Sequence, residues 1–152
     1  MARYSLVSTG RSRADVRVAA QGAAALLVAA AGAIHLYLWF DYFHRVHVVG
    51  ALFLLNAAAG LAIGLALLAR RDVFILLLAG GYAVGTVIVF AISTRWGLFG
   101  YRETFWGGWQ EAAGGVELAA ALLAALLLGT RLGGDAPTPG DAPVRPAPRG
   151  WG

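Results

Sequence analysis

Four long apolar segments, separated by short gaps that carry arginine, constrain the fold of this chain more than any other feature. They cover residues 18–40, 47–69, 73–93 and 109–129. Each segment holds about 20 residues, which is enough for a helix to cross the roughly 30 Å hydrocarbon core of a bilayer. The sequence therefore predicts an all-α, multi-pass integral membrane protein whose first partner is the lipid bilayer.

The composition leaves little chain for anything else. Of the 152 residues, 59% are apolar and 13% are charged, so one membrane domain uses nearly the whole sequence. The chain contains no Cys, which excludes disulfide exchange, thiolate metal ligands and a CxxC redox motif. The net charge of +4 is not accompanied by a stripe of basic and aromatic residues, so no nucleic-acid partner is expected.

The distribution of arginine predicts the orientation. If the N-terminus is cytoplasmic, nine of the twelve basic residues lie on the inner side, and the outer side holds only Arg45, Arg95 and Arg102. We therefore expect a four-transmembrane-helix antiparallel bundle in the cell membrane, with both termini cytoplasmic. The expected loops are short at 41–46 and 70–72, and the long outer connection is 94–108.

The two ends of the chain differ from the spans. Residues 1–17 form a basic segment that serves as a topology signal or lies on an anionic inner leaflet. Residues 130–152 contain all five prolines, and we expect a disordered cytoplasmic tail. A cleaved signal peptide is the alternative for the first segment, but apolar character continues past Ala31 to Phe40, which favours a persistent span.

Small residues recur within the spans at a spacing that lets helices approach closely. Gly60 and Gly64 form one such pair, Gly81 and Gly85 form another, and Gly114 begins an alanine-rich strip in the fourth span. These pairs predict tight helix contacts, either inside one bundle or between the protein and other membrane helices in a homo- or hetero-oligomer.

Three polar residues, His35, Asn56 and Glu117, are predicted to lie inside the membrane, where polar groups are costly. Glu117 is expected ~12 Å below the outer end of its span, on the face that carries Gly114 and Ala121. A carboxyl group there costs roughly 3 kcal/mol on insertion, and six leucines return about 2 to 4 kcal/mol, so this span is only marginally self-inserting. We expect the side chain to point into the bundle.

Asn56 is the partner for Glu117 that the sequence suggests. It is expected ~13 Å from the outer end of the second span, and its amide can hydrogen-bond a carboxyl group at the same depth. His35 is expected ~7.5 Å from the outer end of the first span. For all three residues the alternatives are hydrogen bonding between helices and a ligand or proton-relay role.

Ionisable groups gather at the expected outer rim. His35, Asp41, His44 and His47 fall within thirteen residues, and the second outer loop adds Arg95, Arg102 and Glu103. Imidazole and carboxylate groups suit Zn²⁺ or Cu²⁺, so His44, His47 and Asp41 are candidate metal ligands, although no standard zinc motif occurs. Haem or another cofactor held by His35, His44 and His47 is a further hypothesis. The aromatic residues at this level are expected to form an interfacial belt, and in the alternative they wall a pocket.

Several short motifs resemble a pattern found in uncharacterised four-span integral membrane proteins of actinobacterial type. The motifs are GAIHL at 32–36, GALFL at 50–54, GLFGYRE at 97–103 and Glu117. The resemblance covers about residues 15–130 and implies the four-span topology. Members of that group have no established activity, and they are expected to carry Pro at the position of Phe99.

Two functions follow as expectations. The first is a non-enzymatic accessory or scaffold subunit that binds other membrane helices, because no nucleophile–base pair, phosphate loop or metal motif stands out. The alternative is an outward-facing small-ligand, metal or haem site in the mouth of the bundle, built from His35, Asp41, His44 and His47 above Glu117. An enzyme that uses His35 and Glu117 as acid and base is a third hypothesis, for which the sequence indicates no substrate.

Overall fold

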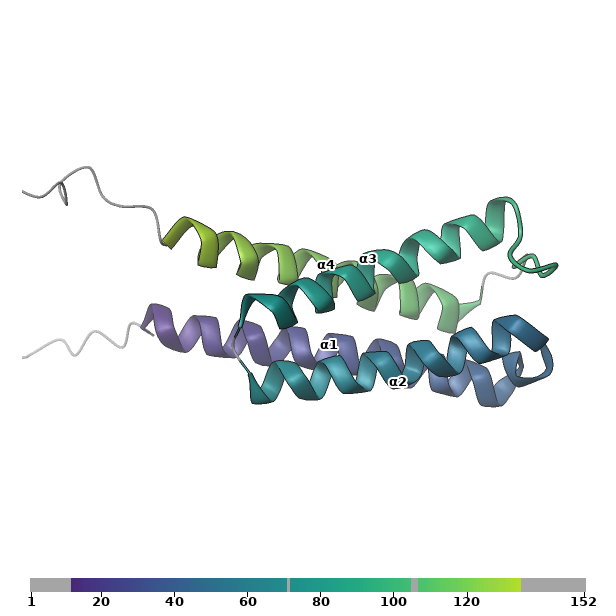
Figure 1. Ribbon diagram of the computed structural model, residues 1–152, viewed down its shortest axis with the longest axis horizontal. Helices are drawn as coiled ribbons and strands as arrows, with labels where there is room; N and C mark the ends of the chain where they lie inside the picture. The colour runs from purple at the N-terminus through teal and green to yellow at the C-terminus, as the bar shows by residue number, and fades with distance from the viewer. Residues whose placement is uncertain (1–11, 71, 105–106, 135–152) are drawn as a thin grey trace, which may run out of the picture.

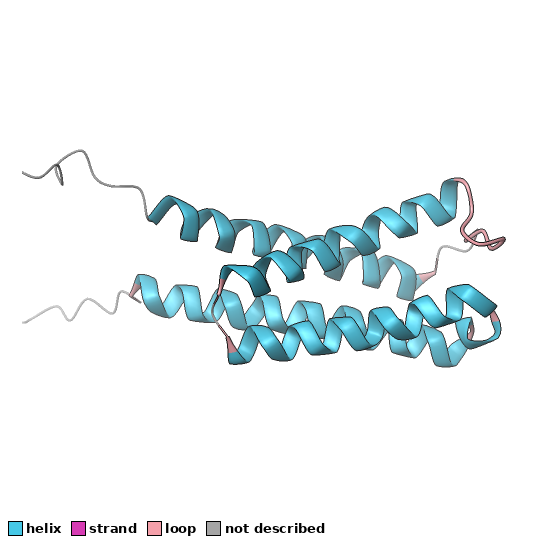
Figure 2. Ribbon diagram, viewed as in Figure 1, coloured by secondary structure: helices cyan, strands magenta, loops and turns pink. Residues whose placement is uncertain are grey.

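The computed structural model describes residues 12–70, 72–104 and 107–134, and this part of the chain is all-helical with no β-strand (Figure 2). Its elements are α1 (Arg13–Asp41), the short 3₁₀ helix η1 (Phe43–Arg45), α2 (His47–Ala69), α3 (Val73–Arg95) and α4 (Gly108–Gly134). Each α-helix is long and apolar enough to cross a membrane. The four predicted spans all lie within these helices.

The first and last helices extend beyond their predicted spans. α1 begins inside the predicted basic segment 1–17, and α4 continues into the predicted tail 130–152. Residues 1–11 and 135–152, to which most of these two predictions apply, lie outside the described residues. The early start of α1 has a local cause: the Ser12 side chain accepts a hydrogen bond from the Asp15 amide, and the Asp15 carboxylate accepts one from the Ser12 amide.

The helices are arranged as two pairs. α1 packs most extensively against α2, and α3 packs against α4, while the contact between α2 and α3 is smaller. Figure 1 shows that α3 diverges from α2 toward the end of the bundle that carries η1 and the loop after α3. The start of α1 and the end of α4 lie together at the opposite end, where the Arg17 guanidinium donates a hydrogen bond to the Thr130 carbonyl.

The α1–α2 pair is held by direct backbone contact. A methyl group built on Gly32 would lie 2.9 Å from the Ala57 carbonyl oxygen and 3.0 Å from the Leu61 nitrogen. On Gly64 it would lie 3.0 Å from the Ala25 carbonyl oxygen. The predicted tight contact of the glycines in the second span is therefore confirmed, and it lies inside the bundle. Only residues without a side chain permit this approach.

The second predicted glycine pair behaves differently. A methyl group built on Gly81 or Gly85 of α3 would meet no atom within 4 Å. The prediction of a tight contact here is wrong for the described bundle, because α3 leans away from α2 and these glycines border open space instead. The core of the described residues is built mostly from small side chains: the largest fully buried ones are Leu67, Leu76 and Val28, and most other core positions are alanine.

A buried glutamine closes the other end of the α1–α2 pair. The Gln21 side-chain amide donates hydrogen bonds to the Leu67 carbonyl at 2.6 Å and to the Arg70 carbonyl at 2.8 Å. The last carbonyl groups of a helix have no hydrogen-bond donor within the helix. The Gln21 amide of α1 supplies donors for two such carbonyl groups at the end of α2. The sequence did not indicate a role for Gln21, because a polar residue near the end of a predicted span is not unusual.

We predict that Gly32→Ala destabilises the protein, because the new methyl group can be accommodated only if the α1 and α2 backbones move apart. Overpacking of this kind costs about 1–3 kcal/mol. Gly22→Ala is the matched control on the same helix, since a methyl group there meets no atom within 4 Å. Thermal unfolding in mild detergent measures both variants, and equal unfolding midpoints would contradict the close backbone contact.

Candidate functional site

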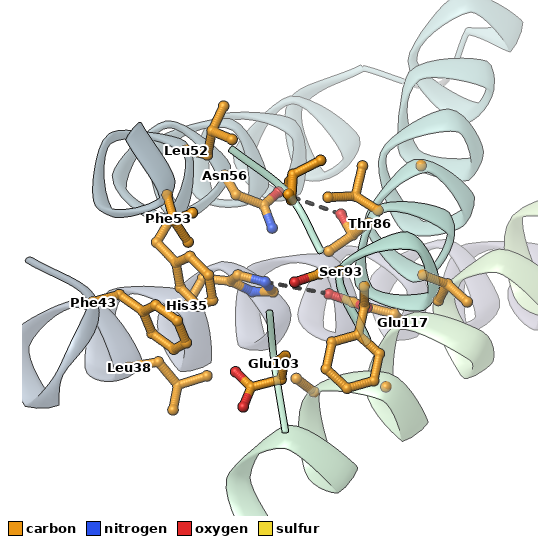
Figure 3. Close-up of a pocket in the computed structure, with 18 of the residues that line it drawn as sticks. His35, Leu38, Phe43, Leu52, Phe53, Asn56, Thr86, Ser93, Glu103 and Glu117 are labelled. Atoms are coloured by element: carbon orange, nitrogen blue, oxygen red, sulfur yellow. Dashed lines mark hydrogen bonds and ion pairs between the residues drawn. The ribbon is translucent and has the colours of Figure 1, made fainter. Parts of the chain in front are cut away.

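A cavity of about 790 Å³ lies between the two helix pairs, at the end of the bundle that carries η1 and the loop after α3. All four helices contribute to its wall, and most of the lining side chains are apolar. The polar residues that line it are His35 from α1, Asn56 from α2, Tyr82, Thr86 and Ser93 from α3, Gln110 and Glu117 from α4, and Tyr101 and Glu103 from the loop. Figure 3 shows how the central members of this set lie around the same space.

His35 and Glu117 lie next to each other in the wall of the cavity. The distance from His35 Nε2 to Glu117 Oε1 is 3.7 Å, and the two residues are only 7% and 2% exposed (Figure 3). The other ring nitrogen of His35, Nδ1, lies 2.9 Å from the Ala31 carbonyl oxygen. A carbonyl oxygen can only accept, so Nδ1 carries a proton and Nε2 is the atom that faces the carboxyl group. The prediction that Glu117 points into the bundle is confirmed.

The pair is close, but it is not hydrogen-bonded. A separation of 3.7 Å exceeds hydrogen-bond length, and Glu117 Oε1 has no hydrogen-bond partner among the described residues. The hydroxyl oxygen of Tyr82, which also lines the cavity, likewise has no hydrogen-bond partner among the described residues. Buried polar atoms are nearly always hydrogen-bonded, and each exception requires an explanation. Here both exceptions border the same cavity.

The expected hydrogen bond between Asn56 and Glu117 is not formed. The Thr86 hydroxyl of α3 lies 3.4 Å from the Asn56 side-chain oxygen and 2.9 Å from the Tyr82 carbonyl oxygen (Figure 3). The prediction matched the two residues by depth alone, and Asn56 faces α3 whereas Glu117 faces α1. Both nevertheless line the cavity.

A row of rings runs from His35 to the outer loop. The ring centroids of His35 and Phe53 are 5.2 Å apart, those of Phe53 and Phe43 are 3.8 Å apart in a stacked arrangement, and those of Phe43 and Tyr101 are 5.6 Å apart. Phe43 is buried, whereas Phe40 and Trp96 are largely exposed. The aromatic residues at this end thus serve in part as a cavity wall and in part as an exposed belt.

A tight turn brings the outer loop over the cavity. Gly97 ends α3 at a positive φ, with its amide bonded to the Ser93 carbonyl, and Leu98 and Tyr101 then exchange backbone hydrogen bonds. The two residues between them, Phe99 and Gly100, both have positive φ, as in a type I′ turn. Phe99 at φ +51° is strained, and a proline cannot adopt this angle. A chain with Pro at this position would need a different turn.

The turn places Glu103 at the cavity, where it is only 7% exposed. The Tyr101 hydroxyl donates a hydrogen bond of 3.2 Å to its carboxylate. Burial, together with the negative charge of Glu103, raises the pKa of Tyr101 to about 12. Arg102 points elsewhere and donates to the Thr94 carbonyl, and both Arg102 and Arg95 are exposed. Of the three loop residues predicted for the site, only Glu103 lines the cavity.

The proposed metal and haem ligands do not converge. Asp41, His44 and His47 are exposed and do not line the cavity, and His44 Nδ1 is bonded to the Trp39 carbonyl at 3.0 Å. His35 is instead buried against Glu117. In the described segments, no three His, Asp or Glu side chains gather as metal ligands would. The reason is geometric, because the 3₁₀ helix after α1 directs His44 to the surface. The candidate ligands are therefore close along the sequence, but their side chains do not gather at one point.

The cavity also holds residues that sequence reasoning missed. Tyr82, Thr86 and Ser93 all belong to α3, where hydroxyl groups carry no charge and attract little attention in an apolar segment. Their spacing was a usable signal, since 82, 86 and 93 lie on one face of a helix.

Comparisons of the chain with protein families, with curated proteins and with solved structures found no match. The resemblance to uncharacterised four-span membrane proteins therefore stays a prediction from the sequence.

We predict that His35 and Glu117 are energetically coupled, because each faces the other in a buried site. His35→Leu should lower the free energy of unfolding by about 1–3 kcal/mol when residue 117 is Glu, and by much less in a Glu117→Leu background. The exposed His47 is the control: His47→Leu should have the same small effect in both backgrounds. The measurement is thermal unfolding of the wild type and the five variants: the three single variants and the two double variants that carry Glu117→Leu. Additive effects at positions 35 and 117 would show that the pair does not interact.

Proposed function

We propose that this protein is a non-enzymatic membrane protein that binds a small, largely apolar molecule in the outer half of the bilayer. The observation that carries the proposal is the cavity of about 790 Å³ in which a fully buried carboxyl oxygen, Glu117 Oε1, lacks a hydrogen-bond partner within the described chain. Ligand sites in proteins are typically concave and apolar, of this size, with a few polar groups that fix orientation.

The wall of the cavity supports the same proposal. Open space borders Gly81 and Gly85 of α3 and Gly114 of α4, so three cavity-lining positions lack the side-chain contacts that a closed core would make. Packed interiors contain few voids larger than a water molecule. A cavity of about 790 Å³ that is partly open at the bundle surface therefore leaves room for a bound molecule. Leu52, Leu55 and Val89 line the cavity and are exposed, which gives the site a route to lipid between α2 and α3.

Accessory or scaffold function, through binding of another membrane helix, is the second proposal. The open glycines of α3 favour it, because a pair of small residues four apart is also what a partner helix packs against. The two proposals differ in what fills the space between α2 and α3. A companion chain that copurifies with the protein in mild detergent would favour the second.

We further propose that the helices form an antiparallel bundle in the cell membrane with both termini in the cytoplasm, so that the cavity opens toward the outside. The excess of arginine in the sequence segments that this orientation assigns to the cytoplasmic side supports it. The hydrogen bond from Arg17 to Thr130 is consistent with it, because it joins the start of α1 to the end of α4.

The orientation predicts which positions can be labelled from outside the cell. The chain has no cysteine, so single variants report without background. A membrane-impermeant maleimide added to intact cells should label Trp96→Cys, whose position is 76% exposed, and should label Asp141→Cys only after the membrane is permeabilised. The reverse pattern would overturn the orientation.

The binding proposal predicts opposite behaviour for two neighbouring glycines of α4. Gly114 lines the cavity and Gly115 does not, and a methyl group on either meets no atom within 4 Å. Gly114→Leu should fill part of the cavity and weaken binding of a neutral apolar probe at least about tenfold, while Gly115→Leu should leave it unchanged. The measurement is energy transfer from tryptophan to N-phenyl-1-naphthylamine, with protein in lipid nanodiscs. If the probe shows no saturable binding to the wild type, the proposal fails.

A further inference from the structure

The chemistry of the cavity wall is acidic on balance. Two buried carboxyl groups, those of Glu103 and Glu117, line it together with one imidazole, that of His35. None of the described residues that line the cavity is Arg or Lys. His35 is therefore the only lining side chain among the described residues that could pair with a negatively charged ligand. The carboxyl groups of Glu103 and Glu117 favour a positively charged one.

One of these carboxyl groups still has the capacity to accept a hydrogen bond. Glu117 is 2% exposed, and its Oε1 has no hydrogen-bond partner among the described residues. His35 Nε2 is near this oxygen, but at 3.7 Å it is too far away to donate to it. A ligand that brings an N–H group to Oε1 would remove the desolvation cost of this atom, which a purely apolar ligand would leave in place.

The aromatic residues complete the environment. Phe53 and Tyr82 line the cavity within the membrane, while Phe43 and Tyr101 line it toward the outer loop. The face of an aromatic ring attracts a cation through its quadrupole, and the attraction grows when the cation is desolvated. The remaining wall is aliphatic and reaches the bundle surface between α2 and α3, where a hydrocarbon chain can enter from lipid.

We propose that the cavity binds an amphipathic organic cation, a molecule with an apolar body and a protonated amine. In this arrangement the amine donates a hydrogen bond to Glu117 Oε1, the rings face the positive charge, and the apolar body lies along the open surface of α3 at Gly81 and Gly85. Glu103 adds a second negative group at the outer side of the same cavity. The proposal rests on the binding function given above and names its ligand class.

The test compares three eight-carbon probes that differ only in the head group: octylamine, 1-octanol and octanoate. Each is titrated against N-phenyl-1-naphthylamine bound to the wild-type protein in nanodiscs of zwitterionic lipid, so that the bilayer itself does not concentrate the cation. Octylamine should displace the neutral probe at a concentration at least about tenfold lower than 1-octanol, and octanoate should be the weakest.

Variants locate the effect. Glu117→Gln should reduce the advantage of octylamine over 1-octanol to less than about threefold, with the affinity for the neutral probe measured for the same variant so that the comparison is normalised. Glu103→Gln should reduce it in the same direction, and it provides a test at a loop position if Glu117→Gln does not fold. Glu111→Gln is the matched control, because Glu111 is an exposed glutamate of the same helix that does not line the cavity; it should behave as the wild type.

The outcomes separate this inference from the function on which it rests. If the neutral probe binds but octylamine has no advantage over 1-octanol in the wild type, the cavity binds apolar molecules without preference for a cation, and this inference is overturned alone. Stronger displacement by octanoate than by octylamine would also overturn it and indicate an anion site at His35. If the neutral probe does not bind at all, the binding function itself fails.

Discussion

The backbone contact between α1 and α2 is the constraint on which the rest of the structure depends. Gly32 on one helix and Gly64 on the other remove the side chains that would separate the two backbones. The contact between α2 and α3 is smaller, and α3 leans away from α2 at one end of the bundle, while α4 stays close to α1 there (Figure 1). Glycines let the α1 and α2 backbones touch, whereas the glycines of α3 border open space. The cavity lies in the space between α3 and the α1–α2 pair.

The polar groups inside the helices follow this division. Away from the cavity, the Gln21 side chain has close partners, since it donates to two carbonyl groups at the end of α2. At the cavity, Glu117 Oε1 and the Tyr82 hydroxyl oxygen have no hydrogen-bond partner in the described chain. In lipid an unsatisfied group costs several kcal/mol, so a bundle that needed only stability would have paired these atoms or replaced them. Their position at the cavity is the observation that supports the proposed binding site there.

The apolar pattern predicted the helices well, because length and hydrophobicity alone decide whether a segment can span a bilayer. It also predicted that Glu117 would point inward, since helical periodicity fixes which residues share its face. It could not identify the partner of Glu117. Depth placed Asn56 and Glu117 at one level, but the choice depends on which helices are neighbours, and the interface of α1 with α4 brings His35 to the carboxyl group instead.

The outer rim shows a second limit of the sequence. Asp41, His44 and His47 are close along the chain, but their directions depend on the 3₁₀ turn between α1 and α2, which no apolar periodicity records. Conversely, the positive φ of Phe99, which shapes the loop that brings Glu103 to the cavity, is unusual for an aromatic residue and could not be expected from its type.

The partnership of His35 with Glu117 also has a consequence for how the chain is made. Glu117 lies in α4, which is synthesised after α1, and its carboxyl group makes that helix a poor candidate to enter lipid alone. His35 lies in α1, so insertion of the helices in chain order would place it in the membrane before Glu117 leaves the ribosome. The Glu117 carboxyl group would then move from water directly to a site next to the His35 imidazole. Because α1 precedes α4 in the chain, we expect the order of synthesis to favour the insertion of α4 next to an α1 helix that already carries His35.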